Sequence, residues 1–254
     1  MQIGRNSYIS PKAKIVNLAG ESPDDFILGD NSYIGDDVQI ICDSFHLGDY
    51  SKLHHHCNAH GKSIHIGHNA WIGQYSILDG LGGISIGDNC GIGAHSQLWS
   101  HIKYGDTLEG CRFESTGKLN VGMDVWFVGH CIISPITAAN KSMALVGSVI
   151  TKDMSENHVY AGSPAKDITD KIGGQFEPRS IEQKMKVMNE LYVEFNKPSS
   201  IVIVESVGDF YDDGKSYFAV NERKYHKKLS DEEVAFMKFL LPTKAKFTPY
   251  LGDF

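Results

Sequence analysis

The sequence contains no apolar run long enough to cross a membrane, and its first residues include no apolar signal segment. Basic residues are outnumbered: 24 Lys and Arg against 31 Asp and Glu give a formal net charge of −7, which disfavours a nucleic-acid partner. Cysteine is scarce, with five residues and no CxxC pair, so no disulfide framework is expected. These absences predict a cytoplasmic protein without membrane insertion.

What the sequence does contain is an aliphatic residue at every sixth position, in phased groups as far as about residue 151. Nine of these residues are followed at once by glycine, as in Ile34-Gly35 and Leu47-Gly48, and a small residue stands four positions after most of them. A helix needs apolar residues every three to four positions and an ordinary strand every second one. A period of six is typical of a parallel β-helix, in which each short strand buries one large side chain.

The phase of the repeat predicts how many strands make one coil. The groups that start at Ile3, Leu28, Leu47 and Ile66 are each three hexads long with a few extra residues, so three hexads are expected to form one coil. Glycine beside the buried aliphatic residue is expected to adopt a positive φ at the corner. The cysteines that occupy the small-residue position are expected to fill the core; they are Cys57, Cys90 and Cys131.

The period changes after Gly173-Gly174, which predicts a β-helix domain over 1–172 and an accessory domain over 176–254. A capping box at 180–183 predicts a helix, and the β-branched stretch 200–207 predicts a strand.

Two further signals complete the accessory domain. Asp213-Gly214 predicts a tight turn that would make 216–220 the antiparallel hairpin partner of 200–207. A second capping box at 230–233 predicts a helix that ends before Pro242. The accessory domain is therefore expected to have the order αββα.

Four segments resemble one family. They are Ile77–Gly87 (ILDGLGGISIG), Val121–Phe127 (VGMDVWF), Leu145–Met154 (LVGSVITKDM) and Ala161–Lys166 (AGSPAK). In combination they are similar to the hexapeptide-repeat acyltransferases, in the xenobiotic and sugar O-acetyltransferase branch. The resemblance covers roughly residues 27 to 168. It implies a mainly β chain that winds as a left-handed parallel β-helix, forms a homotrimer and binds acetyl-CoA in a groove between neighbouring subunits.

The resemblance also implies catalytic residues. In the family, a histidine stands at the start of a loop extruded before the last coils; here that histidine is His101, and the loop is 99–120. Histidine suits proton removal near neutral pH because its unperturbed pKa is about 6.5. Glu114 is the expected orienting carboxylate, with Asp106 as the second candidate. His54, Asp79 and Asp106 are expected to contact the acceptor, with His54 at the place of a family asparagine.

The coenzyme positions follow from the same motifs. Small residues and backbone amides would line the pantetheine arm, and lysines would face the phosphates. The matching residues are Trp126, Gly129, Val146, Gly147, Thr151, Lys152 and Lys166. No metal is expected.

The sequence therefore predicts transfer of an acetyl group from acetyl-CoA to a hydroxyl or amine of a sugar or nucleotide sugar, in surface-polysaccharide biosynthesis. Two alternatives stay open at this stage. A zinc hydratase like the γ-class carbonic anhydrases would use three histidines, for which His60, His65, His95 and His101 are available. The second alternative is a β-helix that has no catalytic activity and serves as a scaffold.

Overall fold

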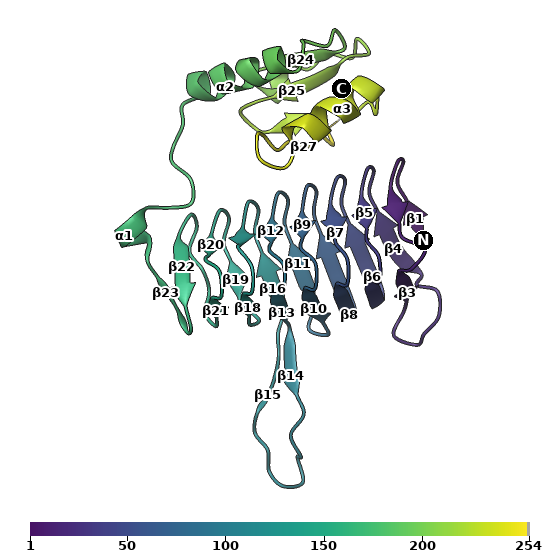
Figure 1. Cartoon of the computed structure of the whole chain (residues 1–254), viewed down its shortest axis with the longest axis vertical. Helices are drawn as coiled ribbons and strands as arrows, with labels where there is room; N and C mark the ends of the chain where they lie inside the picture. The colour runs from purple at the N-terminus through teal and green to yellow at the C-terminus, as the bar shows by residue number, and fades with distance from the viewer. Residues whose placement is uncertain (253–254) are drawn as a thin grey trace. The chain divides into compact units, whose positions relative to one another are not determined.

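The computed structural model describes residues 1–252, which form two compact units, Met1–Phe176 and the segment from Glu177 onward. The first unit is a stack of parallel coils, each of which supplies one short strand to each of three faces (Figure 1). Within residues 1–252, no helix has both the length and the apolar character of a membrane span.

The strands of successive coils pair in parallel and in a regular register. The first face contains β1 (Gln2–Ile3), β4 (Asp25–Leu28), the second halves of β6 (Gln39–Leu47) and β8 (Asn58–Ile66), β11 (Ile84–Ile86), β16 (Leu119–Val121) and β19 (Thr137–Ala138). The second contains β2 (Tyr8–Ile9), β5 (Tyr33–Ile34), β7 (Lys52–Leu53), β9 (Trp71–Ile72), β12 (Gly91–Ile92), β17 (Trp126–Phe127), β20 (Met143–Ala144) and β22 (Val159–Gly162), onto which β23 (Ala165–Asp167) folds back antiparallel.

The third face contains β3 (Lys14–Val16), the first halves of β6 and β8, β10 (Ile77–Gly80), β13 (Gln97–Trp99), β18 (Ile132–Ile133) and β21 (Val149–Ile150). Most aliphatic residues of the hexads point into a single core; Ile34, Leu53 and Ile72 are completely buried, whereas Ile3 in the first coil is 56% exposed. Burial of one such side chain contributes roughly 1.5–3 kcal/mol, so the repeat itself supplies the stability. The prediction of a mainly β fold in which three hexads form one coil, with parallel strands in successive coils, is confirmed.

The expectation about corner glycines is wrong in its mechanism. None of the nine glycines after the hexad aliphatics has a positive φ; that conformation is taken by other corner residues, such as Asn69 (φ 57°) and Asn89 (φ 65°). The glycines are required because the next coil passes too close. A Cβ on Gly48 would lie 2.6 Å from the carbonyl carbon of Gly67, which leaves no room for a side chain.

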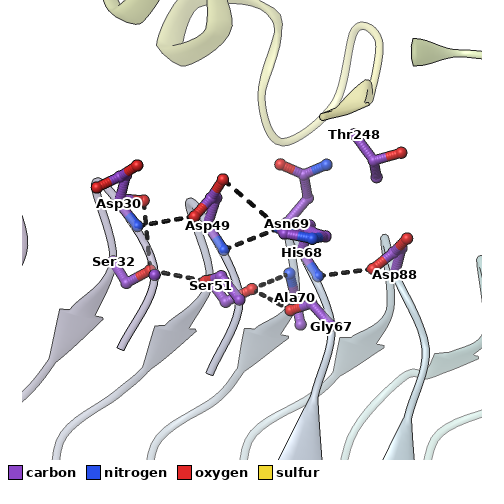
Figure 2. Close-up of polar contacts among 12 residues, drawn as sticks. Asp30, Ser32, Asp49, Ser51, Gly67, His68, Asn69, Ala70, Asp88 and Thr248 are labelled. Carbon is purple, nitrogen blue, oxygen red and sulfur yellow. Dashed lines mark hydrogen bonds and ion pairs between the residues drawn. The ribbon is translucent and has the colours of Figure 1, made fainter. Parts of the chain in front are cut away.

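Where the small residue of a hexad is serine or cysteine, its side chain forms a hydrogen bond to the next coil, as the following examples show. Ser51 Oγ donates to the carbonyl oxygen of Gly67 at 2.6 Å and accepts from the amide of Ala70 at 2.9 Å (Figure 2). Cys57 Sγ and Cys90 Sγ donate in the same way to Gly73 and Gly122 at 3.1 and 3.0 Å. The position is therefore more than a filler of the core, because it satisfies backbone groups that face the interior.

Replacement of Ser51 by alanine is expected to lower the free energy of unfolding by about 1–3 kcal/mol, because the Gly67 carbonyl and the Ala70 amide lose their buried partner. Ser51→Cys should cost less, since the chain uses cysteine at equivalent positions. Urea unfolding at fixed protein concentration measures both values. Equal stability of the alanine and cysteine variants would contradict this role for the hydroxyl.

The cysteines differ in exposure. Cys42, Cys57, Cys90 and Cys131 are buried, Cys111 is exposed, and all five are free thiols. Burial raises the pKa of the Cys42 thiol to about 12 and that of Cys57 to about 11.

The loop predicted over 99–120 contains a β-hairpin. Its strands β14 (His101–Lys103) and β15 (Glu114–Thr116) pair antiparallel and project from the corner between the third and first faces (Figure 1). His101 is the first residue of this hairpin and pairs with Thr116 at its base. The position of His101 is thus set by the coil from which the hairpin projects.

After the short helix α1 (Thr169–Ile172), the second unit contains α2 (Ile181–Glu194), β24 (Ile201–Val204), the 3₁₀ turn η1 (Val207–Asp209), β25 (Ser216–Ala219), β26 (Lys224–Tyr225), α3 (Asp231–Leu240) and β27 (Thr248–Pro249). Both predicted helices are present, with Ser180 and Ser230 as their N-caps. The predicted hairpin is wrong: β24 and β25 run parallel, and β25 pairs antiparallel with β26. The order αββα also omits β26 and β27.

Candidate active site

A buried carboxylate with an imidazole at each of its oxygens lies at the base of the hairpin. Nδ1 of His101 is 2.7 Å from Oδ1 of Asp79, and Nε2 of His60 is 3.0 Å from Oδ2. The coil register produces this cluster. Asp79 in β10 is level with His60 in β8 and with Trp99 in β13, two residues before His101.

Asp79 is completely buried, so its charge depends on protein partners. Ser100 Oγ donates to Oδ1 at 3.1 Å, and Ser100 in turn accepts from the amide of Gly82 at 2.8 Å. These bonds come from the turn that follows β10 and from the residue before the hairpin. Both side chains hydrogen-bonded to Oδ1 thus come from the next coil, whereas Oδ2 has His60 Nε2 at 3.0 Å but no hydrogen bond within residues 1–252.

The contact with Asp79 determines which nitrogen of His101 can act as a base. An ionised carboxylate only accepts, so Nδ1 must carry the proton that points at Oδ1. Nε2 is then left with its lone pair. The side chain of His101 is 22% exposed, which leaves part of the ring open to a reacting partner. A base whose tautomer is fixed by a buried acid is the arrangement needed for proton abstraction.

The two carboxylates predicted to orient His101 have other contacts. Glu114 lies on β15 opposite Lys103, with its Oε2 3.2 Å from Lys103 Nζ. Asp106, in the exposed turn of the hairpin, accepts from the amides of Leu108 and Glu109 at 2.8 and 3.3 Å. The carboxylate hydrogen-bonded to His101 is instead Asp79, which the sequence analysis places at the acceptor. The hexad phase makes Leu78 level with Leu98 and therefore Asp79 level with Trp99, so it does not by itself show the contact with His101.

His54 lies at a different corner, after β7 and between the second and third faces. Its ring packs 4.1 Å from the ring of Trp71 and 5.8 Å from that of Tyr33, measured between centroids. Burial lowers the pKa of His54 to about 4, so this imidazole is neutral at pH 7. A pocket role for His54 stays a prediction.

The histidines considered for zinc do not gather. His60 and His101 share Asp79, His65 stacks on His46, and His95 lies in a ladder of stacked rings with Tyr75 and His130. Three histidines arranged around one open metal position are therefore absent from residues 1–252.

The basic coenzyme candidates line one pocket. Thr151, Lys152 and Lys166 surround a cavity of about 300 Å³ together with Tyr160. Thr151 and Lys152 follow β21 at the corner where His101 follows β13, and β13, β18 and β21 are adjacent strands. At about 4.8 Å per strand, this pocket lies roughly 10 Å along the edge from the His101 coil.

The acids beside these lysines have their own partners. Asp153 accepts from the amide of Thr137 at 2.8 Å, and Asp167 pairs with Nδ1 of His158 at 2.6 Å. Hydrogen bonds from Thr169, and next from His158, lower the pKa of Asp167 to about 2. Within residues 1–252, neither Lys152 nor Lys166 is within ion-pair distance of an acid.

The apolar coenzyme candidates lie on another edge, between the second and third faces. Gly147 donates its amide to the carbonyl of Gly129 at 3.0 Å, with the exposed Val146 beside it. Trp126, on β17 of the second face, is 46% exposed. The third face separates this edge from Thr151 and Lys152, whereas Lys166 lies on β23, which pairs with β22 of the second face.

No family model matches the chain. Galactoside O-acetyltransferase of Escherichia coli (strain K12) is 31% identical over 114 residues, which cover 43% of this chain and 55% of that enzyme. The chain thus spans about half the length of this relative. A solved maltose O-acetyltransferase from Clostridium difficile 630 is 31% identical, covering 45% of this chain and 60% of that one, with a TM-score of 0.39.

A second solved structure is AntD, an N-acyltransferase from Bacillus cereus in complex with dTDP and 3-hydroxybutyryl-CoA. It is 20% identical and covers 77% of this chain and 91% of that one, with a TM-score of 0.46. By its sequence relatives the chain is a homologue of acetyltransferases, as its resemblance to the hexapeptide-repeat family predicts. Its relatives include sugar O-acetyltransferases.

Proposed function

We propose that this chain is an acetyltransferase that moves an acetyl group from acetyl-CoA to a hydroxyl or amine of a sugar or nucleotide sugar, with His101 as the general base. The observation that carries the proposal is the 2.7 Å contact between His101 Nδ1 and the buried Asp79. The named relatives support the reaction class.

The chemistry follows from this tautomer. The acceptor oxygen or nitrogen attacks the thioester carbonyl carbon while Nε2 of His101 takes the acceptor's proton. A carbon–oxygen or carbon–nitrogen bond forms, the carbon–sulfur bond breaks, and the proton passes from His101 to the departing thiolate. Asp79 stabilises the imidazolium that exists between the two proton transfers. His60 lies 3.0 Å from the other oxygen of Asp79 and would add positive charge beside that carboxylate when protonated.

The coenzyme groove requires more than one subunit in this proposal. Thr151 and Lys152 are separated from Gly129 and Gly147 by the third face, so one chain would supply the first pair and its neighbour the second. A homotrimer of left-handed coils, as the family resemblance implies, would bring unlike edges together. The phosphates would then lie at Lys152 and Lys166, and the pantetheine arm would run toward His101.

The acceptor class rests on the relatives, which act on galactosides and maltose by name. A role in surface-polysaccharide biosynthesis and a cytoplasmic location remain predictions.

The direct test is calorimetric titration of the full chain with acetyl-CoA, followed by a screen of sugars, amino sugars and nucleotide sugars for release of free coenzyme A thiol. Saturable binding and an acetylated product identified by mass spectrometry are expected. Failure to bind acetyl-CoA would exclude the proposed transferase.

Replacing both Lys152 and Lys166 by alanine is expected to raise the dissociation constant for acetyl-CoA about tenfold, because two exposed lysine–phosphate contacts contribute roughly 0.5–1 kcal/mol each. The difference should shrink at high salt, since the charges are exposed. Lys14→Ala, an exposed lysine on β3 at the far end of the stack, is the matched control. An equal effect of the control would refute a specific phosphate site.

A further inference from the structure

A second polar cluster lies on the first face of the β-helix and shares no residue with the His60–Asp79–His101 site. Asp25 on β4, His46 on β6 and His65 on β8 come from three consecutive coils. Nε2 of His46 is 2.7 Å from Oδ1 of Asp25. Ser44 Oγ lies between the others, 2.6 Å from Oδ2 of Asp25 and 2.8 Å from Nε2 of His65.

The coil register holds the two imidazoles in a fixed relation. His46 and His65 are direct partners in the parallel pairing of β6 and β8. Their rings stack with centroids 4.1 Å apart and planes 2° from parallel, so both Nε2 atoms lie on the same side of the pair. Little side-chain entropy remains to be lost when a ligand engages both rings.

The donor set matches a transition metal. One ligand atom from each of the three residues lies within 4.8 Å of the other two. Two imidazole nitrogens and one carboxylate oxygen are a ligand combination found in zinc sites, where metal–ligand distances are about 2.0–2.2 Å and a fourth position stays open to water. Within residues 1–252, this is the only such group of His, Cys, Asp or Glu.

We propose that Asp25, His46 and His65 bind a divalent first-row transition-metal ion, with Zn²⁺ as the principal candidate. The metal replaces the proton between His46 and Asp25 and the hydrogen bond between His65 and Ser44, so binding releases protons. It ties three consecutive coils together through their side chains and takes no part in acetyl transfer. No metal was expected from the sequence, because the three ligands are 19 to 21 positions apart and only the coil register aligns them.

The test uses the full chain after treatment with EDTA, titrated with Zn²⁺ against a chromophoric chelator. One tight site per chain is expected, with Mg²⁺ unable to compete because nitrogen ligands suit it poorly. Co²⁺ at the site should give visible absorption bands. His46→Gln and His65→Gln should each weaken Zn²⁺ binding by more than about tenfold, the loss that even an outer-shell change produces.

The matched control is His95→Gln, which removes an exposed imidazole from the ring ladder instead. Zn²⁺ should also raise the thermal unfolding midpoint of the wild type and the control, but not that of the two variants. If a histidine variant does not fold, Asp25→Asn provides the same comparison. Absence of a stoichiometric site, or equal affinity in the wild type and the variants, would overturn the proposal whatever the outcome for acetyl transfer.

Discussion

Replacement of His101 by alanine is expected to lower kcat by about two to four orders of magnitude, the usual contribution of a general base. The dissociation constant for acetyl-CoA should change little, because the lysine pocket lies two coils away along the same edge. Initial rates of coenzyme A thiol release, with calorimetric binding measured on the same sample, separate the two quantities.

Two controls make this result specific. His95→Ala removes an imidazole from the exposed ring ladder and should leave kcat near the wild-type value. Added imidazole should restore part of the activity of His101→Ala, since the cavity left by the side chain borders Asp79. An unchanged rate in His101→Ala would remove this residue from the mechanism.

The second large effect is expected for Asp79→Asn, which keeps the shape of the buried side chain but removes its charge. The amide can donate a hydrogen bond from its NH₂ to Nδ1 of His101. This contact favours the tautomer in which Nε2 carries the hydrogen. A loss of about two to four orders of magnitude in kcat follows, because the base is protonated at the wrong atom and the imidazolium loses its counter-charge.

The matched comparison is Glu114→Gln, at the residue first expected to orient the base. Because Glu114 contacts the exposed Lys103 on the hairpin, this variant should retain most of its activity. His60→Gln should fall between the two, since it alters only the second partner of Asp79. A larger loss in Glu114→Gln than in Asp79→Asn would reinstate Glu114 as the orienting acid.

The repeat could be predicted from sequence because it is a local property. Each aliphatic residue, such as Leu53 or Ile72, faces the core one hexad after the last, so its burial depends on a short stretch of chain. Helix capping is local in the same sense: the box at 180–183 forms as predicted, and at 230–233 Ser230 caps the helix although the Glu233 side chain binds other groups.

What could not be predicted depends on register between coils. His60, Asp79 and His101 are 19 and 22 positions apart in sequence, and no hexad pattern records which polar residues become level. In the second unit, Asp213-Gly214 is turn-like, yet η1 redirects the chain earlier and β25 enters parallel to β24. Turn chemistry alone does not choose the partner of a strand.

The uneven exposure of the thiols has a practical consequence. Because Cys42, Cys57, Cys90 and Cys131 are enclosed by the coils, an alkylating fluorophore added to the folded wild-type chain meets a single accessible sulfur, that of Cys111. This residue lies in the hairpin that begins at His101. The native sequence thus already carries a unique attachment point for an optical reporter on the segment next to the proposed base, without mutagenesis.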